Sequence, residues 1–476
     1  MRIYKIYTIG CKVAQAEATE LRQMLDRFGF IEASHKETPD LCLINSCAVT
    51  LTAAGKSRRL VFKLARLYPH CQIVLLGCYA TVAEPAIREN PQVALIADHR
   101  QGILAALEHY LSQQRSGKSG EPSGSGDIRG DTPNNTYIKP SFTPNVKHKF
   151  LQSPIDQSFS LQSRHRAFLK VQDGCNAGCT YCIIPHLRPN VSSVAETEVL
   201  EQARRLVAEG HQELVLTGIF LGAYGKTTTR KSRFDTPGQP LVQLIDNLLK
   251  IKDLGRLRLS SLEPMDLTRE LLKILSSSNK IAGHLHLPLQ AGSDRVLWKM
   301  GRQYRSENFL AAVQAARSMM PNLALTTDII VGFPGETEDD FLKTLEVSEK
   351  SEFMKIHIFP FSPRPGTPAA EWTDLMIDSP TMKNRLAKLN DLEKHLAQRF
   401  RNQFADQTVR VLVEKVDRQD GIWYCQGRAD QYFMVRFEGR PELDNKFCQV
   451  KIIDTTAEPL IGELTAEKDK DKELDP

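Results

Sequence analysis

Three cysteines, Cys175, Cys179 and Cys182, stand close together in the run D-G-C-N-A-G-C-T-Y-C-I-I-P and could hold an iron–sulfur cluster. Thiolate is the soft ligand that such clusters use. Three thiolates for four irons leave one iron open. An open iron can bind a substrate or a cofactor, whereas a fully ligated cluster mainly carries electrons. The run directly follows an apolar segment, 167–171, which we expect to be a strand.

Two other uses of these cysteines stay open on spacing alone. A structural zinc ion needs four tetrahedral ligands, and no nearby cysteine or histidine completes the set, because His186 lies in a predicted turn. A redox pair of Cys179 and Cys182 needs only C-x-x-C, and Cys175 argues against it.

A second set of cysteines follows three other predicted strands, 3–9, 41–45 and 72–77. The carboxyl ends of parallel strands lie along one edge of a sheet, so we expect these three cysteines to approach one another. They would form a second three-thiolate site; the alternative is three unrelated core cysteines. The set is Cys11, Cys47 and Cys78. We expect the remaining cysteines to pack in cores as small hydrophobic residues: Cys42, Cys71, Cys425 and Cys448.

Length and composition bound the class of protein. A chain of 476 residues predicts two to four domains. The net charge of +5 permits a polyanionic partner without requiring one. The first residues alternate like a strand, unlike a signal peptide, and no apolar run is long enough for a membrane span. Ten cysteines without a secretion signal favour a reducing cytoplasm, and therefore cluster or metal ligation over disulfides.

The pattern along the chain predicts an α/β protein of several parts. Residues 1–112 alternate strand and helix, which predicts a doubly wound parallel sheet. Residues 113–160 are rich in Gly/Ser and then Pro/Asn, which predicts a disordered linker or insertion, with a folded excursion at 137–150 as the alternative.

Six further strand–helix units in 161–403 predict a partial (β/α)6 barrel of the TIM type, with chemistry at the carboxyl ends of its strands. Residues 404–465 predict a small β-barrel, and 466–476 a charged, frayed tail. The expected barrel strands are 168–172, 213–217, 256–260, 285–289, 324–331 and 355–359.

Taken together, the motifs resemble the methylthiotransferases, which are radical S-adenosylmethionine (SAM) enzymes with an added N-terminal domain and a C-terminal TRAM domain. The resemblance covers nearly all the chain except the insertion and the tail. The motifs are T-I-G-C-K-V, I-N-S-C-A-V-T, L-L-G-C-Y-A, K-V-Q-D-G-C-N-A-G-C-T-Y-C-I-I-P, L-T-G-I-F-L-G-A-Y-G, L-S-S-L-E-P, H-L-P-L-Q-A-G-S-D, D-I-I-V-G-F-P-G-E-T and F-S-P-R-P-G-T-P-A.

G-C-K-V and L-T-G-I-F-L-G-A-Y-G look most like the branch that acts on N6-threonylcarbamoyladenosine beside the tRNA anticodon. The alternatives are the isopentenyladenosine branch and the branch that modifies a ribosomal-protein aspartate. The chain departs from the family pattern at three positions. Ala14 replaces the usual Asn, and Ser192 and Val194 stand where arginines are usual, leaving Arg188 alone after the cluster loop. Arginines there could contact phosphates.

The resemblance implies two 4Fe–4S clusters and SAM. A cluster on Cys175, Cys179 and Cys182 would cleave SAM to a radical that removes hydrogen from carbon 2 of the adenine. A cluster on Cys11, Cys47 and Cys78 would hold the sulfur, which a second SAM methylates. An unactivated aromatic C–H bond offers no usable acid or nucleophile, so a cofactor must do this chemistry.

Four further residues, Thr217, Gly218, Glu263 and Gln290, lie at or near the ends of predicted barrel strands and would contact SAM or substrate; the alternative is a loop or turn role. The implied partners are the tRNA anticodon stem-loop and an electron donor such as flavodoxin or ferredoxin, with neither DNA nor a membrane.

Support for RNA contact is weaker. A basic row after Cys47 could meet phosphates or could simply be a solvated helix face; its members are Lys56, Arg58, Arg59, Lys63 and Arg66. The TRAM-like segment carries more acidic than basic residues, so we do not expect a simple electrostatic clamp there. Its aromatic residues could stack on bases or fill the core: Trp423, Tyr424, Tyr432 and Phe433.

A non-catalytic, metal-stabilised RNA-binding protein is the remaining alternative. Two three-cysteine sets without a fourth ligand argue against it, because structural metal sites are closed.

Overall fold

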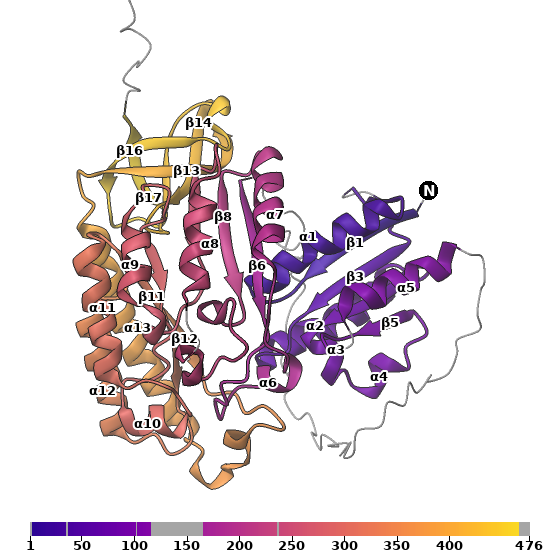
Figure 1. Ribbon diagram of the computed structural model, residues 1–476, viewed down its shortest axis with the longest axis horizontal. Helices are drawn as coiled ribbons and strands as arrows, with labels where there is room; N and C mark the ends of the chain where they lie inside the picture. Colours follow the sequence, from indigo (N-terminus) through magenta and orange to yellow (C-terminus); the bar gives the residue numbers. More distant parts are fainter. Residues whose placement is uncertain (1, 35–36, 101, 116–164, 236–237, 466–476) are drawn as a thin grey trace, which may run out of the picture. The chain divides into compact units, whose positions relative to one another are not determined.

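The computed structural model describes residues 2–34, 37–100, 102–115, 165–235 and 238–465 (Figure 1). The predicted linker lies almost wholly outside these residues and the predicted tail wholly outside them. The chain divides into two compact units, which are described separately. The first comprises Met1–Leu161, Tyr181–Pro189 and Ser362–Glu371, and the second Gln162–Thr180, Asn190–Phe361 and Trp372–Pro476.

The first unit is built on a five-stranded sheet in the order β2-β1-β3-β4-β5, and every pairing in it is parallel. Helices cover both faces: α1 and α5 pack on one through residues such as Leu21 and Leu107, and α2 and α3 on the other through residues such as Val61 and Tyr79. Its strands are β1 (Arg2–Thr8), β2 (Phe30–Glu32), β3 (Leu41–Ser46), β4 (Gln72–Gly77) and β5 (Val93–Ala97), and its helices α1 (Lys12–Arg27), α2 (Leu51–Leu67), α3 (Cys78–Val82), α4 (Pro85–Arg88), α5 (Ile103–Arg115) and α6 (Ile184–Leu187).

This strand order confirms the predicted doubly wound sheet and gives it a switch point between β1 and β3. In such sheets ligands bind outside the carboxyl ends of the strands at the switch point. Cys11 follows β1 and Cys47 follows β3, so both flank that position. The packing prediction for Cys42 and Cys71 is also confirmed, because both are buried in the core under α2.

The second unit contains the predicted partial barrel. Strands β7-β6-β8-β9 form one sheet and β10-β11-β12 another. Parallel bridges from Leu257 to Ile281 and from Ser261 to His286 connect them. The elements are β6 (Arg166–Asp173), β7 (Ser192–Ser193), β8 (Glu213–Gly218), β9 (Arg256–Leu259), β10 (His284–His286), β11 (Ala324–Val331) and β12 (Lys355–Pro360), with helices α7 (Glu196–Ala208), α8 (Pro240–Leu249), α9 (Arg269–Ser276), α10 (Asp294–Lys299), α11 (Ser306–Met319), α12 (Glu338–Ser351) and α13 (Ser379–Asn402).

Five strands after α13 close into the predicted small β-barrel, in the order β13-β14-β15-β17-β16 (Figure 1). Cys425 and Cys448 lie in its core, as expected. Its strands are β13 (Thr408–Gln419), β14 (Ile422–Ala429), β15 (Met434–Glu438), β16 (Phe447–Asp454) and β17 (Leu460–Leu464). Sequence analysis missed β17, as it missed the short edge strands β2 and β7.

One predicted strand is shorter than expected. We expected 285–289, but β10 ends at His286. Pro288 has no N–H to give to a ladder. Beyond it, the Leu289 N–H donates to the Thr327 side-chain hydroxyl at 2.9 Å instead of to a backbone carbonyl.

A buried ion-pair network fixes the small β-barrel against the partial barrel. Glu213 on β8 accepts hydrogen bonds from Arg256 and Arg258 on β9, and all three side chains are fully buried. Arg256 also pairs with Asp430 after β14 at 2.9 Å. The arginines hold the pKa of Glu213 below its usual range despite a burial that would raise it. Within the described residues, no helix is long and apolar enough to cross a membrane.

Glu213→Ala tests this network. The substitution leaves Arg256 and Arg258 buried without their carboxylate, and uncompensated buried charge is expensive. We expect the free energy of unfolding of the second unit to fall by about 3–5 kcal/mol, measured by chemical denaturation. The control is Glu346→Ala, which breaks an exposed pair with Lys350 and should change nothing measurable. Equal effects of the two substitutions would contradict the network's role.

Candidate active site

Cys11, Cys47 and Cys78 gather at one edge of the N-terminal sheet. Cys11 is the N-cap residue of α1, Cys47 directly follows β3, and Cys78 opens α3. The three thiols are near enough that negative charge on Cys11 and Cys47 raises the pKa of Cys78. Cys47 and Cys78 are buried, whereas Cys11 is exposed, so the group opens to solvent on the Cys11 side.

Burial dominates the proton chemistry of these thiols. It raises the pKa of Cys47 and raises that of Cys78 to about 12. At neutral pH both are therefore thiols until a metal centre replaces the proton, since metal binding to cysteine releases protons.

Glycines allow the segments that carry these cysteines to approach one another closely. Gly77 precedes Cys78 and has φ +92°, and a Cβ there would lie 2.6 Å from the Ser46 carbonyl oxygen. Gly10 precedes Cys11 with φ +143°, and a Cβ there would lie 3.0 Å from the Cβ of Cys47. Any side chain at either position would push the cysteine-bearing segments apart.

Two buried arginines, Arg188 and Arg364, act on the cysteines electrostatically. Arg188 hydrogen-bonds Cys78 and lowers its pKa, in opposition to burial. It is held by Glu17 on α1, whose carboxylate accepts from Nη1 at 3.0 Å. The sequence suggested that arginines after the cluster loop contact phosphates, but Arg188 is buried at the cysteine site instead.

Arg364 acts on Cys47 from the segment Ser362–Glu371. Its guanidinium is buried, and burial lowers its pKa. Among the described residues, its Nε and Nη1 atoms have no hydrogen-bond partner. A buried cation whose donors lack acceptors is costly unless an anion is bound nearby.

The other cysteine loop is positioned by side chains that sequence analysis did not single out. The Thr229 hydroxyl lies 3.4 Å from Cys175 Sγ and accepts from the Asn176 N–H at 2.9 Å. Burial raises the pKa of Cys175, and Thr229 opposes the shift. Arg302 donates to Cys179 Sγ at 3.4 Å and pairs with Glu263. Cys182 belongs to the other unit, where it is half-buried just before α6.

The four predicted SAM contacts differ in their surroundings. Thr217 is buried near the end of β8, and Gly218 packs against Gln172, whose Cβ lies 3.0 Å from where a Cβ would stand. Glu263 pairs with Arg302, which donates to Cys179 Sγ, and it is also the N-cap residue of the short 3-10 helix Pro264–Asp266. Gln290 has φ +63°, and its backbone N–H and C=O both bond to β11.

The residues predicted to contact RNA also differ in their surroundings. The five basic residues of α2 are exposed, and Arg58 pairs with Glu84 at 3.5 Å. Phe433 is in the small-barrel core. Tyr432 stacks on His284 with ring centroids 4.6 Å apart, so it packs inside the unit. Trp423 and Tyr424 lie under Arg418 and Arg436 respectively.

Known proteins match the two stretches of sequence that carry the cysteine sets. The Radical SAM superfamily matches residues 169–347, and the uncharacterized protein family UPF0004 matches residues 3–98. The threonylcarbamoyladenosine tRNA methylthiotransferase MtaB of Bacillus subtilis is 32% identical over 95% of this chain and 94% of its own length. This chain belongs to the radical SAM methylthiotransferase family.

Two further comparisons extend the family assignment. MtaB of Thermotoga maritima is 33% identical over 97% of each chain, and a tRNA-2-methylthio-N(6)-dimethylallyladenosine synthase of Pelotomaculum thermopropionicum is 31% identical over 98% of each. Among solved structures, the radical S-adenosylmethionine methyltransferase TsrM of Kitasatospora setae has a TM-score of 0.53 at 15% identity, covering 78% of this chain and 77% of its own. That likeness supports the fold.

Membership of this family gives the cofactors as SAM and 4Fe–4S clusters. The first unit fits such a cluster on the evidence of its own side chains. Three thiols converge there. Among the described residues, the buried Nε and Nη1 donors of Arg364 have no acceptor, so this side chain could donate to an anionic group. Cluster sulfides are acceptors of the required kind, and hydrogen bonds to them tune such centres.

Arg364→Met tests whether Arg364 helps to hold a cluster or instead stabilises the fold. Removing a buried, unsatisfied cation should leave the stability of the iron-free protein equal or higher. The same change should reduce the iron retained at the Cys11 set after anaerobic reconstitution, measured by iron and sulfide analysis. Arg59→Met, on the exposed face of α2, is the control and should change neither. A loss of stability with unchanged iron would contradict the assignment.

Gly77→Ala tests the close approach beside Cys78. The new Cβ meets the Ser46 carbonyl, and the left-handed backbone disfavours any side chain. We expect a loss of about 1–3 kcal/mol in unfolding free energy together with reduced iron loading. Gly29→Ala is the matched control, because Gly29 has φ +78° but nothing within 4 Å of a new Cβ. It should lose less stability and retain full iron loading, and equal iron loss in both variants would count against the proposed packing.

Proposed function

We propose that this chain methylthiolates carbon 2 of N6-threonylcarbamoyladenosine at position 37 of tRNA, with one 4Fe–4S cluster on each cysteine set. The observation that carries the proposal is the gathered, open set of Cys11, Cys47 and Cys78 with two buried arginines beside it. Three protein ligands leave a coordination position for an exogenous sulfur. A barrel with a second cysteine set suits the radical half of the same reaction.

The chain's own residues divide this work. When bound, SAM and the clusters would supply hydrogen abstraction at the adenine and the methylated sulfur. Arg188 and Arg364 would neutralise cluster charge in the first unit. Thr229 and Arg302 would hold the sulfur ligands Cys175 and Cys179 in the second. Thr217, Gly218, Glu263 and Gln290 would bind and orient SAM or substrate.

The substrate branch rests on likeness over the full chain. Relatives named for threonylcarbamoyladenosine reach 32–33% identity, and those named for dimethylallyladenosine reach 30–32%. That margin is narrow, so the dimethylallyladenosine branch, which acts on isopentenyladenosine, is the second candidate. The motif contexts at Cys11 and at Thr217 favour the threonylcarbamoyladenosine branch.

The partners follow from the same chemistry. The exposed basic face of α2 would meet phosphates of the anticodon stem-loop, because its lysine and arginine side chains are exposed to solvent and attract a polyanion. A one-electron donor such as flavodoxin or ferredoxin would reduce the radical SAM cluster. With these partners, we propose that the enzyme works in the cytoplasm.

Nucleoside mass spectrometry tests the proposal. A bacterial strain without its own tRNA methylthiotransferases is complemented with this chain, with Cys47→Ala, or with Cys71→Ala as a control, since Cys71 lies in the core outside both sets. The wild type and the control should convert threonylcarbamoyladenosine to its 2-methylthio form. Cys47→Ala should accumulate the unmodified nucleoside, because one cluster ligand is lost.

The other outcomes discriminate among the alternatives. Methylthiolation of isopentenyladenosine alone would move the chain to the second branch. If neither nucleoside changes and a ribosomal-protein aspartate is methylthiolated, the chain belongs to the branch that modifies that protein. A colourless, zinc-loaded protein that binds tRNA without modifying it would support the non-catalytic alternative.

A further inference from the structure

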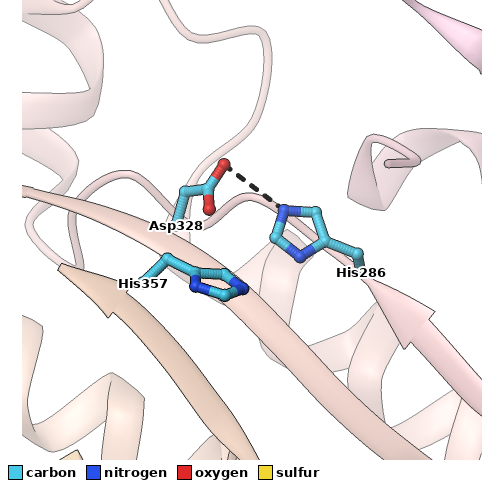
Figure 2. A group of neighbouring side chains, drawn as sticks. All are labelled: His286, Asp328 and His357. Carbon is cyan, nitrogen blue, oxygen red and sulfur yellow. Dashed lines mark ion pairs between the residues drawn. The ribbon is translucent and has the colours of Figure 1, made fainter. Parts of the chain in front are cut away.

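Three side chains of metal-ligating types lie together on adjacent strands of the partial barrel, and none of them is a cysteine (Figure 2). His286 comes from β10, Asp328 from β11 and His357 from β12. One ligand atom of each lies within 4.8 Å of those of the other two. The group contains two imidazoles and one carboxylate.

The strand register explains why these residues meet. Asp328 is paired directly with His357, and His286 is paired with Thr326, two residues before Asp328. Residues two apart on a strand share a face. His286, Asp328 and His357 are therefore neighbours on one face of the sheet, and the flanking Leu285, Ile329 and Ile356 are buried on the other.

The orientation of His286 is set by a second hydrogen bond. Its Nδ1 lies 2.9 Å from the Thr326 hydroxyl, while its Nε2 faces the Asp328 carboxylate at 3.3 Å. The same hydroxyl lies 3.0 Å from Nε2 of His284, so Thr326 bridges two histidines. Metal-bound histidines are usually held in this way, with one ring nitrogen on an outer partner and the other on the metal.

Exposure is graded across the group. The side chain of His286 is 9% exposed and that of Asp328 31%, and His357 is exposed. The carboxylate stands between a buried ligand and an open one. A metal bound here would be anchored on the β10 side and would keep coordination positions open toward solvent.

We propose that His286, Asp328 and His357 bind a divalent transition-metal ion. Two histidines and one carboxylate with open positions are a ligand set for zinc or ferrous iron, whereas magnesium and calcium prefer oxygen donors throughout. The site uses no cysteine, so the ion would be additional to the iron–sulfur clusters. A hydrogen-bonded polar lining without a metal is the competing account.

Cobalt titration of the full chain distinguishes the two accounts. The protein carries its reconstituted clusters and is freed of excess iron. Co²⁺ should bind with about one equivalent per chain at this site and give the d–d absorption of a nitrogen–oxygen ligand set, and Zn²⁺ should displace it. Asp328→Asn and His357→Gln should abolish this binding. Thr326→Val should weaken it by about 10- to 100-fold, because only the outer partner of His286 is lost.

Two controls keep the test decisive. His395→Gln alters an exposed histidine of α13 and should leave cobalt binding unchanged. Iron and sulfide content should be equal in all variants, which separates this site from cluster loss. Absence of the cobalt band in the wild type, or a band that persists in Asp328→Asn and His357→Gln, would overturn the proposal.

Discussion

Parallel strands that end on the same edge of the N-terminal sheet are the constraint on which the first unit depends. β1, β3 and β4 are each followed by a cysteine at that edge. Ligands of such sheets bind beyond the carboxyl ends of the strands at the switch point, which here lies between β1 and β3. The approach of the segments is so close that a Cβ at Gly77 would clash with the Ser46 carbonyl and a Cβ at Gly10 would crowd that of Cys47. The backbone thus sets the spacing of the thiols before any cluster is bound.

Charge follows from that geometry. Burial keeps Cys47 and Cys78 protonated in the absence of metal, and the same burial leaves the arginine donors of Arg364 without acceptors among the described residues. An anionic cluster would replace the protons of the two thiols and would also accept hydrogen bonds from Arg364. The Glu17–Arg188 pair supplies a second cation that is held in place by its own counter-ion.

Much of this could be read from the sequence, because the relevant signals are local. Short strand-like runs followed by cysteine predicted both the strands and the edge at which the thiols meet, and the alternation of strand and helix patterns predicted the partial barrel. The end of β10 could not be predicted, since Thr327 replaces a backbone partner beyond Pro288. The edge strands β2 and β7, of three and two residues, carry too few residues for a pattern.

The arginines beside the cysteines could not be predicted from the sequence, for a different reason. Arg188 and Arg364 come from segments far from Cys47 in sequence, and nothing in their immediate context marks them as neighbours of the cysteines. Thr229 and Arg302 likewise reach the second cysteine loop through tertiary packing. The His286, Asp328 and His357 group emerges only when the registers of three strands are known. Long-range pairing, not residue type, carries this information.

The most direct test of the account is the iron content of two triple variants after anaerobic reconstitution, followed by Mössbauer spectroscopy. The wild type should hold about eight irons per chain in two 4Fe–4S clusters. Alanine at Cys11, Cys47 and Cys78 should leave about four, and alanine at Cys175, Cys179 and Cys182 should also leave about four. If replacing Cys11, Cys47 and Cys78 removes no iron, the gathered thiols do not hold a cluster and the account of the first unit is wrong.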